Sequence, residues 1–228
     1  KNGIAIHDLA SNQIITYQDL NKQVVEFAKI LSDGEILSDG EIGKGVVVID
    51  MPKTYHFIVA QLACSYLGKP FLSLDNKQTE RNFDIINDIS PEIVLKGLRD
   101  FSRFDCFNEF ESDCEYVVYS SGSTGKPKGI LLKGEPAINI VAQQSEIIGI
   151  KPGEKYLWLL NTAFDASLSD IYSTFVAGAT LVIPDFETTE VKKLAHTIER
   201  YGINYIDLPP SMFEIFNKLT TKHNFKSL

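Results

Sequence analysis

The sequence has 228 residues, of which 44% are hydrophobic and 23% charged, a composition that favours a globular protein with a sizeable core over a disordered chain. Its 22 Lys and Arg against 30 Asp and Glu give a net charge of −8, which disfavours nucleic acid and anionic lipid as partners. No apolar run reaches the roughly 18 residues of a membrane span, and the first residues lack the apolar stretch of a signal peptide. We therefore expect a cytoplasmic protein without a membrane partner.

Short apolar runs alternate with stretches of helical period, which predicts an α/β fold of mostly parallel sheets flanked by helices. Thr16 and Asp19 resemble a capping box that opens a helix extending through Leu31. Strands are predicted at residues 46–49, 70–74, 93–95, 116–119, 130–132, 156–160, 180–183 and 205–208. Helices are predicted at residues 55–67, 137–148, 167–176 and 191–201, and a further one starts within residues 209–216.

The hexapeptide ILSDGE occurs twice in succession, at residues 30–35 and 36–41. Architectural repeats have periods of about 20 residues or more, so this pair does not indicate a solenoid. It lies at a predicted helix-to-strand junction, where extra residues cost little closure entropy. We interpret the pair as a lengthened loop; a partner-binding loop is the alternative.

Cysteines and histidines predict neither a disulfide framework nor a metal site. The cysteines are odd in number and contain no CxxC pair, so reduced structural thiols are expected at Cys64, Cys106 and Cys114. The histidines are scattered without the spacing of metal ligands, at His7, His56, His196 and His223.

The stretch YSSGSTGKPKG at residues 119–129 joins two predicted strands and differs sharply from them in composition. Its glycines allow close backbone approach, its hydroxyls offer hydrogen bonds and its lysines add charge, so it suits a loop around phosphate oxygens. An ordinary polar turn is the alternative from composition alone. A P-loop is disfavoured, because it needs four residues between its glycines, whereas two residues separate Gly122 from Gly125.

Position by position, this stretch resembles the phosphate-binding signature of the adenylate-forming superfamily: acyl-CoA synthetases, luciferases and peptide-synthetase adenylation domains. Other segments resemble that family in the same order: ITYQDLN at residues 15–21, YLGKPFLSLD at 66–75, FDAS at 164–167 and GATLVI at 178–183. The first two also fit an ordinary helix start and a helix-to-strand junction, so it is their joint order that counts. The chain most resembles the N-terminal part of a nonribosomal peptide synthetase amino-acid adenylation domain, which implies the N-terminal subdomain of the adenylate-forming fold.

The resemblance implies roles for individual residues. Contact with the phosphates of ATP is implied for Ser120, Ser121, Gly122, Ser123, Thr124, Gly125, Lys126 and Lys128, and Lys128 is the implied catalytic residue. Asp165 is implied to pair with the α-ammonium group of an amino acid, in a pocket that Ala166 and Ser169 also line. Capping of the helix that follows is the alternative role of Asp165, and the local sequence alone favours it.

The implied reaction uses ATP and Mg²⁺ to activate an amino acid carboxylate as an acyl-adenylate, for loading onto the phosphopantetheine thiol of a carrier protein. An acyl- or aryl-CoA ligase of the same superfamily and a truncated, non-catalytic nucleotide-binding module are the alternatives. Residues 1–228 correspond to the N-terminal portion of an AMP-binding domain, without the family's C-terminal portion and lid domain, so we expect this fragment alone to be inactive. The sequence differs from the family pattern at Gly134, where family members usually carry His.

Overall fold

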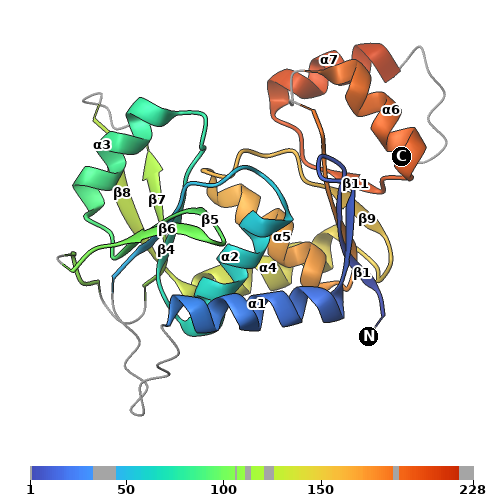
Figure 1. The fold of residues 1–228 in the computed structure, drawn as a ribbon. Helices are drawn as coiled ribbons and strands as arrows, with labels where there is room; N and C mark the ends of the chain where they lie inside the picture. The colour runs from blue at the N-terminus through green and yellow to red at the C-terminus, as the bar shows by residue number, and fades with distance from the viewer. Residues whose placement is uncertain are drawn as a thin grey trace. The chain divides into compact units, whose positions relative to one another are not determined.

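The computed structural model describes residues 2–32, 45–105, 107–110, 114–120, 126–186 and 190–220. The chain forms two compact units, which Figure 1 draws as a ribbon. Unit 1 comprises Lys1–Gln18, Ile140–Asn161 and Ala166–Leu228, and unit 2 comprises Asp19–Asn139 and Thr162–Asp165. Most of the tandem hexapeptide pair lies outside the described residues, and so does Cys106.

Unit 1 is built on a five-stranded sheet with the order β11-β9-β10-β1-β2. The strands are β1 (Ile4–Asp8), β2 (Gln13–Thr16), β9 (Lys155–Leu157), β10 (Thr180–Ile183) and β11 (Tyr205–Ile206). Neighbouring strands run parallel, apart from the antiparallel pair β1–β2. The helices that belong wholly or mainly to this unit are α4 (Gly134–Ile148), α5 (Asp165–Val176), α6 (Val191–Tyr201) and α7 (Pro210–Thr220).

The alternation of side chains along β9 and the residues after it divides the core of unit 1 between two faces of the sheet. Leu157 and Leu159 pack in one cluster with Leu194 of α6 and Phe216 of α7. Tyr156 and Trp158 point the other way and reach α5. The sheet therefore carries α6 and α7 on one face and α5 on the other.

Unit 2 is built on a six-stranded sheet with the order β6-β5-β3-β4-β7-β8. The strands are β3 (Val47–Ile49), β4 (Phe71–Ser73), β5 (Ile93–Gly97), β6 (Asp100–Arg103), β7 (Cys114–Ser120) and β8 (Lys128–Lys133). The inner pairs are parallel, and the outer pairs β5–β6 and β7–β8 are antiparallel. The helices are α1 (Tyr17–Leu31), α2 (Tyr55–Leu67) and α3 (Thr79–Ile89).

Opposite faces of the unit 2 sheet are covered by α3 and α2. Ile85 and Ile89 of α3 pack in one cluster with Val48 and Leu72 of the sheet. On the other face Gln61 of α2 donates a hydrogen bond of 3.0 Å to the Ser73 hydroxyl. Because α2 is apolar on nearly all sides, it is buried, as expected for a helix inside a layered α/β unit.

The mostly parallel α/β architecture is confirmed, and α2, α6 and β10 have the predicted bounds. Pro136 lies in the first turn of α4, which begins three residues before the predicted start at 137. The structure adds elements that the sequence reading did not predict, namely β1, β2, β6 and α3. Of these, α3 supplies two side chains that form hydrogen bonds with Tyr119 of β7.

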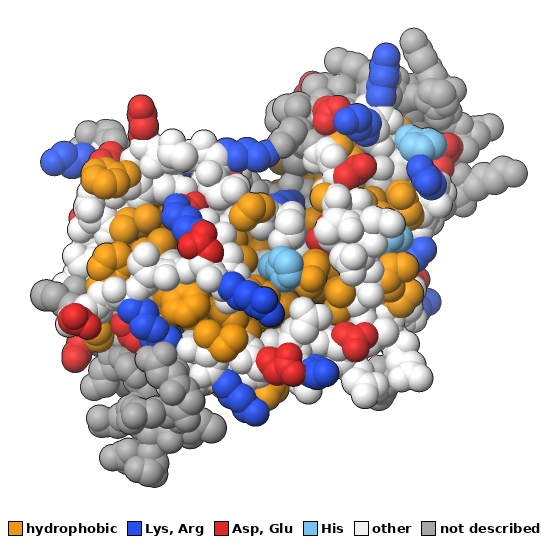
Figure 2. All heavy atoms as spheres, viewed as in Figure 1, with side chains coloured by type: hydrophobic (Ala, Val, Ile, Leu, Met, Phe, Trp, Pro, Cys, Tyr) orange, Lys and Arg blue, Asp and Glu red, His pale blue; other side chains and the backbone are white. Residues whose placement is uncertain are grey.

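Acidic and basic side chains are interspersed on the face drawn in Figure 2, without a continuous patch of one sign. Several large hydrophobic side chains are exposed, including Phe83 of α3 and Tyr66 of α2. Within the described residues, the helices are too short or too polar to cross a bilayer.

Candidate functional site

The predicted phosphate loop connects the two strands of the β7–β8 hairpin. The register pairs Ser120 with Lys128, and the hydroxyl of Ser120 donates a hydrogen bond of 3.5 Å to the carbonyl oxygen of Lys128. The side chains of Ser120, Lys126 and Lys128 are exposed. The remaining predicted ATP contacts lie outside the described residues: Ser121, Gly122, Ser123, Thr124 and Gly125. The hairpin thus brings both ends of the predicted loop together and leaves two lysines accessible.

Tyr119 and Gly129 face each other one position further from the loop. A Cβ atom added to Gly129 would lie 3.1 Å from Cζ of Tyr119, closer than nine in ten real Cβ contacts. The phenol donates a hydrogen bond of 2.7 Å to Asp88 of α3, and the side chain of Tyr119 is only 8% exposed. Glycine at position 129 therefore makes room for the tyrosine ring at the base of the loop.

A polar network lies at the carboxyl ends of the parallel strands of unit 2, the edge at which open α/β sheets bind ligands. Asp50 directly follows β3, and its carboxylate accepts a hydrogen bond of 3.1 Å from Asn82 of α3 and pairs with Lys96. Asn82 also donates to the carbonyl oxygen of Asp75, at 2.8 Å. Sequence reasoning missed this network because it depends on α3.

A small hollow lies in this network, behind Tyr119. Its volume of about 10 Å³ suits one water molecule rather than a nucleotide. Polar groups in its wall come from Asp75, Gln78, Arg81 and Asn82. This hollow is therefore too small to hold a nucleotide.

Asp165, the predicted partner of the substrate's amine, belongs to unit 2 and is exposed as the first residue of α5. Burial raises the pKa of Tyr116, a residue of β7, and the nearby charge of Asp165 raises this pKa further. Three residues before Asp165, the Thr162 hydroxyl donates a hydrogen bond of 2.8 Å to the carbonyl oxygen of Leu74 at the end of β4. The structure thus brings Asp165 close to the strand that leads into the predicted phosphate loop.

The predicted pocket residue Ser169 follows Asp165 by four residues and Ala166 by three, so it shares a helix face with each of them, whereas Asp165 and Ala166 are adjacent in the sequence. Asp165 and Ala166 are exposed and Ser169 is half-buried. The helix begins at Asp165, two residues before the predicted start at residue 167. Asp165 is therefore a first-turn residue, where the helix dipole favours its negative charge.

Two buried hydrogen bonds fix α5 on the sheet of unit 1. The indole nitrogen of Trp158 donates to the hydroxyl of Ser167 at 2.8 Å, and the phenol of Tyr156 donates to the carboxylate of Asp170 at 2.7 Å. Burial and the neighbouring Asp170 carboxylate raise the pKa of Tyr156, so the phenol stays protonated and donates. These bonds fix the buried face of α5 against the residues of β9 and the segment after it.

The described residues contain no group of three His, Cys, Asp or Glu side chains arranged to hold a metal ion. Burial raises the pKa of the Cys64 thiol to about 12, and Cys114 is also buried and free. A thiol with so high a pKa is not a nucleophile at neutral pH.

Comparison with known proteins supports the same family at the level of sequence. The profile of the family described as AMP-binding enzyme matches residues 108–228, more than half of the chain. Malpibaldin synthetase of Mortierella alpina is 26% identical over 234 residues, which cover 92% of this chain and 4% of the synthetase. Surfactin synthase subunit 2 of Bacillus subtilis (strain 168) is 28% identical over 246 residues, which cover 96% of this chain and 7% of that subunit.

The fold is also similar to that of a solved enzyme, o-succinylbenzoate coenzyme A synthetase from Bacillus subtilis in complex with ATP and magnesium ion. The TM-score is 0.74 at 18% identity, and the match covers 93% of this chain and 61% of the enzyme. The chain therefore spans a small part of the two synthetases and less than two thirds of the solved enzyme. These matches confirm the resemblance to adenylate-forming enzymes seen in the sequence. The chain belongs to the AMP-binding enzyme family.

Proposed function

We propose that this chain is the nucleotide- and acid-binding part of a ligase that activates an amino acid with ATP. A carboxylate oxygen of the amino acid attacks the α-phosphorus of ATP, the bond to the bridging oxygen breaks, and pyrophosphate leaves. The thiol of a carrier-protein phosphopantetheine then attacks the acyl carbonyl, loses its proton and displaces AMP to form a thioester. Loading of a carrier protein is proposed from the resemblance of the sequence motifs to those of peptide-synthetase adenylation domains.

The observation that carries this proposal is the arrangement of the β7–β8 hairpin. Ser120 and Lys128 are paired at its exposed end, and the charge of Asp165 reaches Tyr116 on the same strand as Ser120. A site that joins a carboxylate to a phosphate must neutralise two anions and hold them in line. Lys128 supplies positive charge for the phosphates, while Asp165 holds the amine of the second substrate.

Loop residues with hydroxyl or glycine side chains are proposed to complete the phosphate contacts: Ser120, Ser121, Gly122, Ser123, Thr124 and Gly125, with Lys126 beside them. Mg²⁺ is proposed to enter with ATP as part of the substrate, because proteins usually hold it through one or two carboxylates together with substrate phosphates. Bound in this way, the ion adds positive charge where the pyrophosphate leaves.

Asp165 is what favours an amino acid over the alternative of an aryl or fatty acid. A carboxylate in a substrate pocket gains from a cationic partner, and aryl and fatty acids carry no amine. Ala166 and Ser169 are proposed to line the pocket around the side chain of the substrate. An acyl- or aryl-CoA ligase remains the second candidate, because the fold is similar to that of a coenzyme A synthetase.

The direct test is amino-acid-dependent exchange of labelled pyrophosphate into ATP, measured on the intact natural protein that contains this chain. We expect exchange with at least one amino acid, and a loss of about 100-fold for Lys128→Ala. Lys133→Ala is the matched control, because Lys133 is an exposed lysine at the other end of β8. Exchange with aryl or fatty acids alone would support the coenzyme A ligase instead, and no exchange with any carboxylate would contradict both.

A further inference from the structure

Tyr119 is held at both of its polar ends by α3. Arg81 donates a hydrogen bond of 3.1 Å from Nη2 to the Tyr119 carbonyl oxygen, and Asp88 accepts the phenol's hydrogen bond at 2.7 Å. Arg81 and Asp88 are seven residues apart, two turns or about 10.5 Å along one face of the helix. The tyrosine therefore lies along α3, with its backbone at one end of the helix and its hydroxyl at the other.

The ring of Tyr119 is fixed between these two hydrogen bonds. It is buried in one cluster with Ile85 and Ile89 of α3, and its other side lies against Gly129 of β8. Burial raises the pKa of Tyr119, and the hydrogen bond to Asp88 raises it further. The phenol consequently remains a donor throughout the neutral range, and the contact with Asp88 persists.

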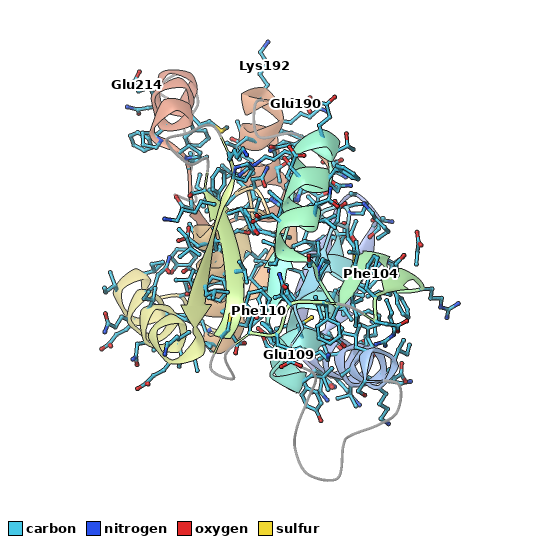
Figure 3. The ribbon with its side chains drawn as sticks, turned by 90° about the vertical axis from the view of Figure 1, so that its left-hand side faces the viewer. Phe104, Glu109, Phe110, Glu190, Lys192 and Glu214 are labelled. Carbon is cyan, nitrogen blue, oxygen red and sulfur yellow. The ribbon has the colours of Figure 1, made fainter. Side chains whose placement is uncertain are left out.

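Tyr119 lies next to both ends of the predicted phosphate loop. Tyr119 directly precedes Ser120 in β7, and Gly129 directly follows Lys128 in β8. The ring of Tyr119 lies against Gly129, so Tyr119 is linked to the residues at both ends of the loop. Figures 1 and 3 show α3 beside the β7–β8 hairpin in two perpendicular views. Movement of Tyr119 away from α3 would move both strand ends at once.

We infer that Arg81 and Asp88 of α3 are positioning residues for nucleotide binding, which act through Tyr119 to hold Ser120 and Lys128 in place for the phosphates of ATP. This inference rests on the proposed function, because it assigns the phosphates to the end of the β7–β8 hairpin. Neither residue needs to touch the nucleotide. Preorganisation of this kind lowers the entropic cost of binding, so its loss weakens binding of ATP rather than of the acid.

Substitutions that remove one hydrogen bond each test the inference in the intact protein. Tyr119→Phe, Asp88→Ala and Arg81→Gln are each expected to raise the KM for ATP about threefold to tenfold, the range that corresponds to one lost hydrogen bond. The KM for the acid should stay within about twofold of the parent value. Tyr119→Phe combined with Asp88→Ala should cost no more than either change alone, because both remove the same contact.

Tyr205→Phe is the matched control, since the Tyr205 phenol donates a hydrogen bond of 2.9 Å to Glu154 in unit 1. It removes the same type of contact far from α3 in the sequence, and we expect an unchanged KM for ATP. Arg81→Lys should restore part of the affinity by again donating to the Tyr119 carbonyl oxygen.

Amide hydrogen exchange provides a second readout that does not depend on activity. Tyr119→Phe and Arg81→Gln should speed exchange in peptides that cover β7 and β8, while peptides from β9 and β10 keep the parent rate. Unchanged exchange in β7 and β8, or a change in the KM for the acid with no change for ATP, would overturn the inference. A parent protein without pyrophosphate exchange would instead contradict the proposed function, and the amide exchange result would still decide whether α3 holds the hairpin.

Discussion

The hydroxyl of Thr162 donates a hydrogen bond of 2.8 Å to the carbonyl oxygen of Leu74, and both residues are buried within unit 2. Leu74 directly follows β4, whereas Thr162 lies three residues before Asp165. One hydrogen bond between residues far apart in the sequence therefore ties the segment that carries Asp165 to the carboxyl end of a central strand. The segment that carries Asp165 is thus bonded to the end of β4, and β4 pairs with β7, the strand that leads into the predicted phosphate loop.

Removal of this hydrogen bond by Thr162→Val should raise the KM for the amino acid by about threefold or more, with a smaller effect on ATP. The substitution keeps the shape of the side chain and leaves a buried carbonyl without its donor. Thr180→Val is the matched control, because Thr180 donates a bond of equal length, 2.8 Å, to Ile4 in unit 1. Equal effects of both substitutions on the KM for the amino acid would contradict a specific role for Thr162.

Substitution of Asp165 by Asn should lower kcat/KM for the amino acid by about 10- to 100-fold, because a charged partner of the ammonium group is lost. The KM for ATP should not change. Glu135→Gln is the control, since Glu135 is also an acidic residue in the first turn of a helix. Both variants lose a similar favourable interaction with a helix dipole, about 0.3–1 kcal/mol, so the difference between them reports on substrate binding. Steady-state pyrophosphate exchange provides the measurement.

Gly45→Ala should destabilise the fold by more than about 2 kcal/mol. An added Cβ would overlap with Cβ of Glu92 and lie 2.6 Å from Cδ2 of Phe107, so the surrounding side chains would have to move. Glu92 also accepts a hydrogen bond of 2.7 Å from the buried ammonium group of Lys69, which the same movement would weaken. Gly97→Ala is the control, because its nearest contact is an ordinary 3.6 Å. Urea unfolding of the two variants should show a large loss only for Gly45→Ala.

Stability should fall between about pH 10 and pH 12, partly because of Tyr17. Burial raises the pKa of Tyr17 to about 12, and its phenol donates a hydrogen bond of 2.6 Å to the carbonyl oxygen of Ala179. In the unfolded chain a tyrosine loses its proton near pH 10, so alkaline solution stabilises the unfolded state first. Tyr17→Phe should therefore show a smaller loss of unfolding free energy over this range. An identical alkaline loss in both proteins would show that Tyr17 does not contribute.

Elements with a strong local signal could be predicted from the sequence. The apolar run of α2 ends at Gly68, which adopts a left-handed conformation with φ of 64°, and α6 has a similar stop at Gly202. Both helices have the predicted bounds, because hydrophobic period and terminating glycine agree. The strand β10 is a continuous apolar run between a glycine-containing turn and Pro184, and it was predicted for the same kind of reason.

The missed elements owe their structure to contacts with distant parts of the chain. The strand β1 pairs with β10, whose residues lie more than 170 positions further along, so its short pattern carried little information. The helix α3 buries Asn82 in line with Ile85 and Ile89, and this polar residue interrupts the apolar period by which a helix is recognised. Asn82 is buried because it bonds to Asp50 and Asp75, which only the folded sheet brings together.

The candidate site could be predicted in part for the same reasons. Glycine, hydroxyl and lysine residues in one stretch indicated the phosphate loop, and the structure confirms the strands on either side of it. The proximity of Asp165 to β7 and the contacts of Tyr119 with α3 depend on tertiary packing, which no local pattern encodes. The roles of the loop residues, Asp165, Ala166 and Ser169 stay predictions.

The most direct test is a crystal structure of the intact protein with ATP, Mg²⁺ and the amino acid that supports pyrophosphate exchange. We predict phosphate oxygens at the end of the β7–β8 hairpin, within hydrogen-bond distance of Nζ of Lys128, and the substrate's ammonium group paired with Asp165. A nucleotide bound elsewhere, or an Asp165 carboxylate that bonds only to amides of α5, would contradict this account.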